Sequence, residues 1–350
     1  MRIPVTLVAR EMLAMLLAAS QAVAVSDPAP SPGGPGTGTP VEHLRVGLGF
    51  IPSVQFAQFY LADEAGYYAE AGLDVTLENK IDSELITLLG HGAVDVGMAD
   101  GTSLIPAVSQ GIPVVYGATV YARFPNVVFA PAASGIDEVA DLAGKRIGIP
   151  GRFGSSWVML QALLGSAGLS VEDVEVVTYP DFGQAVAVAA GQVDAATGFL
   201  NNEPVQLARD GVPVNVLSID EVAPLPGPGL AVGRDTLAAR GPALRTFTEV
   251  TLRAMEEIMA DPQLGLDATF ARVPELASDP ETQRAILEAT IAAWQDESPG
   301  AKELGVVDRD VWRSALDIMR ALPDSAVAAS LDVDELVTDE LLRAAPDGGY

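Results

Sequence analysis

A short cassette that occurs twice, about 100 residues apart, is the feature that most constrains the fold of this chain. It reads GAVDVG at residues 92–97 and GQVDAA at residues 191–196. Each copy follows an apolar helical stretch, starts a short apolar strand and runs into a polar cluster, at 99–103 and at 201–204. A helix–turn–strand unit repeated at this spacing predicts two similar α/β lobes. Open α/β sheets bind ligands at the carboxyl ends of their strands, so the polar clusters predict a cleft between two facing walls.

Length, charge and composition exclude several classes of function. The 350 residues are enough for two domains, each with its own core. The formal net charge of −27 speaks against a broad nucleic-acid surface, because it would repel the phosphate backbone, and against sustained attraction to anionic lipid. The chain has no cysteine, which removes disulfides, thiolate metal sites and cysteine nucleophiles together.

The first 43 residues predict an export signal followed by a tether. Residues 1–25 have a positive start at Arg2, an apolar run over 12–19 and the small residues Ala-Val-Ala at 22–24. Ser20 stands where a lipoprotein signal has its lipidated cysteine, which speaks against a lipid anchor. Residues 26–43 are rich in proline and glycine, as linkers are. We therefore expect an exported protein, at the extracytoplasmic face of the cell membrane or in the periplasm.

From residue 44 onward, short apolar strands alternate with helices, which predicts mostly parallel sheets flanked by helices. From about residue 236 the chain is expected to be helical almost throughout. Helix ends are predicted at Gly241-Pro242, Asp261-Pro262 and Asp279-Pro280. Lobe 1 is assigned to residues 44–130 plus 229–350, and lobe 2 to residues 131–228.

Polar side chains at the predicted strand ends are candidates for reading the hydrogen-bonding groups of a ligand. Residues 201–203 (Asn-Asn-Glu) directly follow a strand and offer donors and acceptors to both edges of a planar heterocycle. Asp100 and Ser103 occupy the corresponding place after the first cassette, and Gln55 lies in the first strand-to-helix turn. The alternative for each cluster is a capped turn at the start of a helix.

Aromatic residues are concentrated in one part of the chain: 15 of the 20 Phe, Tyr and Trp residues lie between Phe50 and Phe199. Several fall at predicted strand ends or helix starts, where they could stack on a flat ligand: Phe56, Tyr121, Phe124, Phe153, Trp157 and Phe182. The alternative is that each ring belongs to the hydrophobic core.

The glycine-rich turn at residues 150–157 leads from a strand into a helix expected over Ser155–Ala167, with Ser155 as its N-cap. Backbone N–H groups or hydroxyls at Gly154 and Ser155 would suit an anion or a carbonyl oxygen. The turn lacks the Gly-Lys-Ser/Thr of nucleotide-hydrolase phosphate loops. A tight turn capped by serine is the alternative.

Catalytic and metal-binding readings find little support. The two histidines are His43, at the end of the tether, and His91, in the turn of the first cassette. Neither has aspartate or glutamate at a metal-ligand spacing, and no Gly-x-Ser-x-Gly elbow is present. We therefore predict no enzyme activity, no cofactor and no metal.

Several segments taken together resemble the substrate-binding proteins of bacterial ABC importers, in the branch related to thiamine pyrimidine synthase. These segments are residues 49–60, 64–68, 72–75, 111–116, 141–145, 151–154 (Gly-Arg-Phe-Gly) and 201–204 (Asn-Asn-Glu-Pro). The resemblance covers about residues 44–320 and implies the two-lobed periplasmic-binding-protein type II fold. It also implies two crossings between the lobes, near residues 129–133 and 225–230, which form a hinge that closes over the ligand.

Family members with this pattern resemble carriers of vitamin precursors, either the aminopyrimidine of thiamine or riboflavin. The Asn-Asn-Glu-Pro segment resembles one whose glutamate meets the pyrimidine ring, which implies that role for Glu203. Sulfonate and nitrate carriers share the fold and are an alternative. Such carriers are expected to have more cationic anion-binding residues, and the candidates in this sequence are only Arg123 and Arg152, which weakens this alternative. The synthase is an alternative of another class; it carries a cysteine-rich motif, which this chain lacks.

The resulting prediction is a monomeric solute-binding protein that delivers a small heteroaromatic ligand to an ABC permease in the membrane and binds no nucleic acid. The predicted ligand-binding residues are Gln55, Phe56, Asp100, Ser103, Tyr121, Arg123, Phe153, Gly154, Ser155, Trp157, Phe182, Asn201, Asn202 and Glu203.

Overall fold

The structure is a computed structural model that describes residues 41–79, 82–295, 302–322 and 325–342. The predicted signal segment 1–25 and nearly all of the linker 26–43 lie outside these ranges. Among the described residues, no helix has the length and apolar character needed to span a bilayer.

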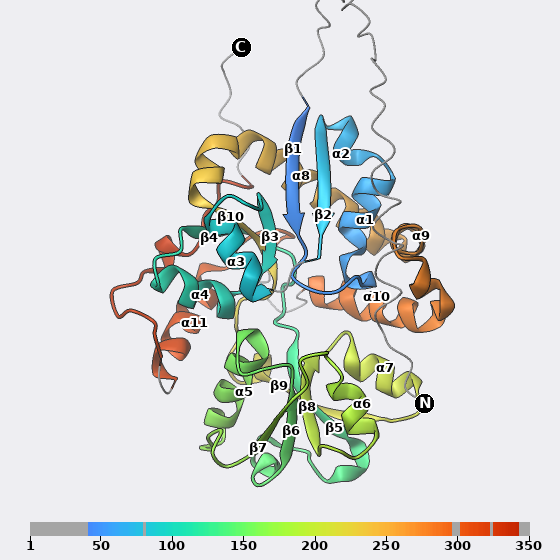
Figure 1. Ribbon diagram of the computed structural model, residues 1–350, viewed down its shortest axis with the longest axis vertical. Coiled ribbons are helices and arrows are strands. Elements are labelled where there is room, and N and C mark those ends of the chain that lie inside the picture. Colours follow the sequence, from blue (N-terminus) through green and yellow to red (C-terminus); the bar gives the residue numbers. More distant parts are fainter. Residues whose placement is uncertain (1–40, 80–81, 296–301, 323–324, 343–350) are drawn as a thin grey trace, which may run out of the picture. The chain divides into compact units, whose positions relative to one another are not determined.

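Two five-stranded sheets of the same topology form the framework (Figure 1). The first, of order β2-β1-β3-β10-β4, consists of β1 (Glu42–Gly47), β2 (Leu73–Glu78), β3 (Val96–Ala99), β4 (Val114–Thr119) and β10 (Gly229–Gly233). The second, of order β7-β6-β8-β5-β9, consists of β5 (Asn126–Pro131), β6 (Arg146–Ile149), β7 (Glu175–Thr178), β8 (Ala195–Phe199) and β9 (Val214–Ser218). In each sheet one strand, β10 or β5, runs antiparallel between two neighbours. The central strands β3 and β8 are almost entirely buried, as expected for strands covered on both faces.

Helices flank both sheets (Figure 1). Those of the first sheet are α1 (Ala57–Glu64), α2 (Tyr67–Glu70), α3 (Asp82–Gly90) and α4 (Gly101–Ser109). Those of the second are α5 (Gly154–Ser166), α6 (Gln184–Ala189) and α7 (Glu203–Arg209). The C-terminal helices are α8 (Arg234–Ala260), α9 (Pro262–Arg272), α10 (Pro280–Trp294) and α11 (Arg309–Ala321). They pack mainly against the first sheet and its helices.

One of two local expectations needs correction. The end predicted at Gly241-Pro242 coincides with a break in α8, where two helical segments join at a kink and Arg240 has a non-helical φ of −129°. Proline removes one helical hydrogen bond and bends a helix, which accounts for the kink. Ser155, however, is not an N-cap, because α5 begins one residue earlier and Phe153 occupies the cap position without a side-chain bond. The next helices, α9 and α10, begin at Pro262 and Pro280, directly after the ends predicted there.

The aspartate of each cassette ties two strands of its sheet together. Asp95 accepts the N–H of Arg45 on β1 at 2.8 Å, and its own N–H donates to the Arg45 carbonyl at 2.9 Å. Asp194 makes the same two bonds to Arg146 on β6, both at 2.9 Å. Each carboxylate also pairs with an arginine: Asp95 with Arg240 at 2.7 Å, and Asp194 with Arg146 at 2.8 Å. The repeated cassette is therefore a structural device that sets the position of β3 and β8.

The chain passes between the sheets twice, through residues 120–125 after β4 and through residues 219–228 before β10. The predicted lobe boundary, between residues 130 and 131, falls inside β5, whose partners β8 and β9 both belong to the second sheet. A further contact joins the two halves, because α7 packs on α10.

Candidate functional site

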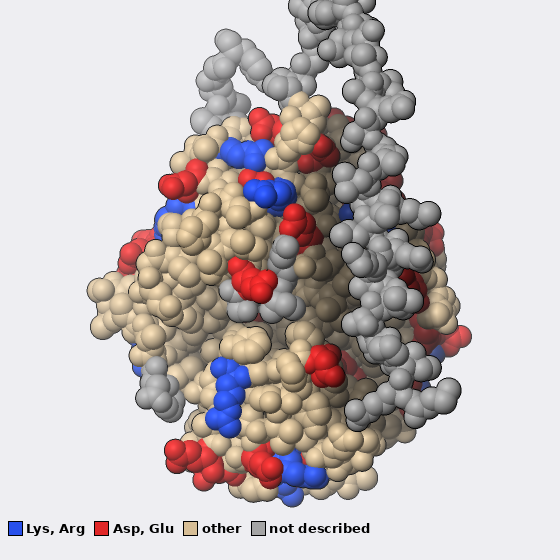
Figure 2. All heavy atoms as spheres, in the orientation of Figure 1, with Lys and Arg blue, Asp and Glu red and all other residues tan. Residues whose placement is uncertain are grey.

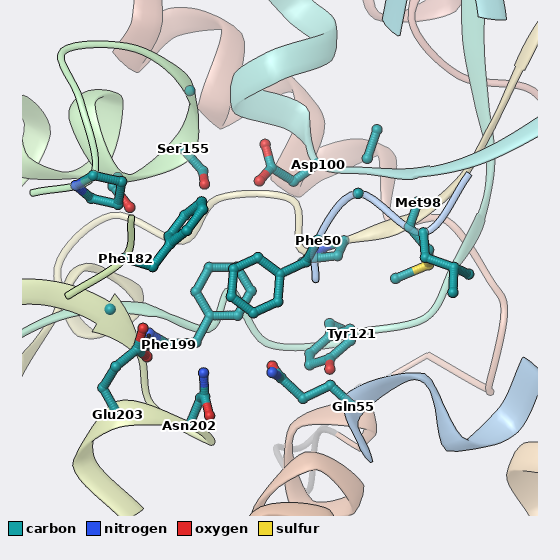
Figure 3. Close-up of a pocket in the computed structure, with 18 of the residues that line it drawn as sticks. Phe50, Gln55, Met98, Asp100, Tyr121, Ser155, Phe182, Phe199, Asn202 and Glu203 are labelled. Carbon is teal, nitrogen blue, oxygen red and sulfur yellow. Dashed lines mark hydrogen bonds between the residues drawn. The ribbon is translucent and has the colours of Figure 1, made fainter. Parts of the chain in front are cut away.

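A cavity lies where the carboxyl ends of β1 and β3 face those of β6 and β8 (Figure 3). It has an empty volume of about 1030 Å³, counting the space open to solvent. The cassette strands contribute directly: Met98, Ala99 and Asp100 at the end of β3, and Gly198 and Phe199 at the end of β8. Figure 2 shows acidic and basic side chains interspersed over the visible face of the molecule.

The cavity brings together most of the predicted site residues. Those that line it are Gln55, Phe56, Asp100, Tyr121, Phe153, Gly154, Ser155, Phe182, Asn202 and Glu203. Those outside its lining are Ser103, Arg123, Trp157 and Asn201. The lining is thus drawn from segments more than 100 residues apart, as two facing walls require.

Glu203 is a buried acid of the cavity wall whose pKa is strongly raised. Its side chain is 8% exposed, and Oε2 accepts the N–H of Phe199 at 2.8 Å. Burial raises the pKa of Glu203 to about 7, although bonds from the backbone N–H groups of Phe199 and Glu203 itself oppose the shift. No side-chain donor from the described part of the chain contacts this carboxylate. A ligand N–H is the partner that would satisfy it.

Asp100 faces the cavity from the first sheet while capping α4. Its Oδ1 accepts the N–H groups of Thr102 at 2.9 Å and Ser103 at 3.1 Å. Burial raises the pKa of Asp100, and these bonds lower it. Ser103 lies outside the lining because its N–H and hydroxyl both point back to Asp100. The sequence left a helix cap and a cavity residue as alternatives for Asp100, and in the structure Asp100 is both.

Two phenylalanines meet across the cavity. Phe50 follows β1, Phe182 follows β7, and their rings contact edge to face at 5.1 Å between centroids (Figure 3). Phe182 has φ of +59°, the one non-glycine residue with positive φ in the described ranges. This conformation is unfavourable for an aromatic residue and is typical of functional sites. The strain is held by the bond from the Phe182 N–H to the Tyr179 carbonyl, which closes the turn.

Asn201 lies behind the cavity wall instead of lining it. Its side chain is 1% exposed, and Nδ2 donates to Gln55 Oε1 at 3.1 Å and to Thr290 Oγ1 at 2.8 Å. The Tyr121 hydroxyl lies 3.5 Å from the same nitrogen. These contacts join the loop after β8 to α10 and to the turn after β1. Asn201 therefore positions Gln55.

The other two residues outside the lining have different surroundings. Trp157 is half-buried against the hydrophobic core, and the Arg152 guanidinium lies 5.4 Å from its ring centroid. Arg123 is exposed and pairs with Asp220 at 3.3 Å. Neither the Trp157 ring nor either candidate anion-binding arginine reaches the cavity lining.

Sequence reasoning missed several lining residues, among them Phe50, Met98, Ser156, Gln184 and Phe199. Phe50 and Phe199 lie at strand ends, so the rule that selected Phe56 could have found them. Gln184 was missed because it begins a helix, α6, whose other residues are all apolar. It is 1% exposed and donates to the Thr197 carbonyl at 3.3 Å, while its Oε1 has no partner in the described part of the chain.

Comparison with known proteins places the chain in a family. Residues 53–264 match the family described as NMT1/THI5 like. The chain belongs to this family. The riboflavin-binding protein RibY of Chloroflexus aurantiacus is 33% identical over 346 residues, which cover 97% of each chain. The formylaminopyrimidine-binding protein of Halalkalibacterium halodurans is 26% identical and covers 80% of this chain and 86% of its own.

Among solved structures, the alkanesulfonate-binding protein SsuA of Xanthomonas axonopodis pv. citri bound to MOPS superposes on this NMT1/THI5-like protein with a TM-score of 0.64. The two are 22% identical, and the match covers 83% of this chain and 98% of SsuA. This likeness confirms the predicted periplasmic-binding-protein fold, with two sheets flanked by helices.

Proposed function

We propose that this protein is an extracytoplasmic solute-binding protein of an ABC importer that captures a small heteroaromatic vitamin precursor. One observation carries the proposal: a single cavity between the strand ends of two sheets is lined by aromatic rings and by a few buried polar groups, Glu203 and Asp100 among them. Rings supply stacking area, and the few polar groups fix orientation. Closure of the two lobes would bury the ligand and create the form recognised by a permease.

The relatives support a riboflavin-like ligand first and the pyrimidine of thiamine second, since proteins named for riboflavin and formylaminopyrimidine binding are both similar to this chain. Sulfonate or nitrate transport is less consistent with the cavity, because Arg123 and Arg152 do not line it. We further propose that the protein makes and breaks no bond. The cavity lining has no histidine or cysteine, and no group of three or more acidic or histidine side chains in the described ranges could hold a metal.

A ligand screen tests this function. We expect riboflavin or formylaminopyrimidine to raise the melting temperature of the purified protein, and taurine and nitrate to leave it unchanged. Glu203→Ala should then raise the dissociation constant tenfold or more, since a hydrogen bond to a charged group contributes about 1.5–3 kcal/mol. Calorimetry with the exposed Glu275→Ala as control measures this. Binding of none of these heteroaromatic compounds would contradict the proposed function, and an unchanged constant would remove Glu203 from the site.

A further inference from the structure

Two amide side chains of the cavity, Gln55 and Asn202, have an orientation that is set by neighbouring hydrogen bonds. An asparagine or glutamine can present either an oxygen or an N–H group, and neighbouring hydrogen bonds decide which. Gln55 and Asn202 both line the cavity, and in each the amide oxygen already accepts a bond from another side chain. Both residues are therefore left with N–H groups to offer.

For Gln55, the orientation is set by a chain of hydrogen bonds that begins on α10. The Thr290 hydroxyl donates to the Ile286 carbonyl at 2.7 Å, so its oxygen must accept, and Asn201 Nδ2 donates to it at 2.8 Å. The same Nδ2 donates to Gln55 Oε1 at 3.1 Å. Gln55 Nε2 donates one hydrogen bond to Ser53 Oγ, at 3.0 Å. Its second hydrogen has no acceptor among the described residues.

For Asn202, the orientation is set by a neighbour on its own helix, α7. Gln206, one turn further along α7, donates Nε2 to Asn202 Oδ1 at 2.6 Å. No bond from Asn202 Nδ2 is formed within the described ranges, and Figure 3 shows this nitrogen directed into the cavity. The adjacent Glu203 carboxylate takes only backbone N–H groups and so offers an acceptor.

These three groups follow one another along one side of the cavity. Figure 3 shows Glu203, Asn202 and Gln55 in that order, with the rings of Phe50 and Phe199 beside them. The protein thus offers an acceptor, a donor and a second donor. A planar ligand that satisfies them must carry a donor followed by two acceptors on one edge. The flavin ring has this sequence in N3–H, the C4 carbonyl and N5, whereas an aminopyrimidine carries one acceptor beside its amino group and then a carbon.

We propose that the cavity recognises the N3–H, C4=O and N5 edge of an isoalloxazine ring, with N3–H donating to Glu203, Asn202 donating to the C4 carbonyl and Gln55 donating to N5. Asn201, Thr290 and Gln206 are positioning residues that fix this polarity without touching the ligand. The inference rests on the proposed function, because it specifies which heteroaromatic ligand the cavity takes.

Two riboflavin analogues test the assignment on the unmodified protein. N3-methylriboflavin lacks the donor and should bind at least about tenfold more weakly than riboflavin, since it loses a bond to a charged group. In 5-deazariboflavin a C–H group replaces N5, which should weaken binding about fivefold, the value of one neutral hydrogen bond. Fluorescence titration with riboflavin, both analogues and formylaminopyrimidine gives the constants.

The variant Gln55→Met then tests which residue reads N5. It removes the amide and keeps the length of the side chain, so riboflavin and 5-deazariboflavin should bind it equally, while the penalty for N3 methylation stays. Gln192→Met, at an exposed glutamine outside the cavity, should keep both penalties. Equal binding of riboflavin and both analogues by the unmodified protein would overturn the inference. Tight binding of formylaminopyrimidine without riboflavin would also overturn it, although the proposed function would then stand.

Discussion

Glu203→Gln is expected to stabilise the ligand-free protein at pH 8 by about 3 kcal/mol more than at pH 4.5, because glutamine does not ionise. The pKa of the buried Glu203 is about 7, against an ordinary value of 4.5. Folding therefore favours the protonated form. The stabilisation from this group is complete below the unfolded pKa and is lost as the pH rises through 7. Above that pH, the folded protein carries a poorly solvated carboxylate that the glutamine variant lacks.

Urea unfolding of both proteins at several pH values between 4.5 and 8 measures the effect. The exposed Glu275→Gln serves as control, since it makes the same chemical change away from the cavity. A difference between Glu203→Gln and the unmodified protein that stays constant with pH would show that burial does not perturb Glu203. The same variant should bind the ligand more weakly, so stability at high pH and ligand affinity should change in opposite directions.

Asp95→Ala should lower the free energy of unfolding by about 2 kcal/mol, since it leaves a backbone N–H without its acceptor and removes one partner of a partly buried ion pair. The Asp95 side chain is 11% exposed and bonds both the Arg45 N–H and the Arg240 guanidinium. Without it, the Arg45 N–H loses its acceptor between β1 and β3, and Arg240 keeps only its contacts with Glu42 and the His43 carbonyl. Chemical denaturation measures the loss.

Asp194→Ala is the matched variant, because Asp194 makes the same backbone bonds in the second sheet. Its side chain is 34% exposed, so water can replace more of the hydrogen bonds that the substitution removes. The loss of stability should therefore be clearly smaller than for Asp95→Ala. Ligand affinity should change little in either variant if the two aspartates only hold strands. Equal losses of stability in the two variants would contradict the interpretation that burial distinguishes them.

The repeated cassette was sufficient to predict two similar sheets and the place of the cavity, because strand ends in an open α/β fold bring distant segments together. The strand pairing was harder to predict. Strands β10 and β5 run antiparallel to their neighbours, but their amino-acid composition does not differ from that of the parallel strands. Their partners lie up to about 130 residues away, so no local pattern records the pairing.

Within the site, residue type and position predicted Glu203, Asn202, Asp100 and Gln55 as lining residues, but not the direction of each side chain. Asn201 and Asn202 are adjacent and chemically identical, yet one faces α10 and the other the cavity. Trp157 was placed in the site because it follows a glycine-rich turn. The packing of its ring against the core depends on neighbours that the sequence does not identify.

The two ends of the second sheet's chain segment lie side by side, since Val127 on β5 pairs with Ser218 on β9. Everything between them is continuous in sequence, including Asn202 and Glu203. A segment with adjoining ends can be cut out and grafted as one piece with little rearrangement at the junctions. Exchange of this segment between relatives would thus replace half of the polar cavity wall at once, which gives recombination a route to new ligands that single substitutions would reach only step by step.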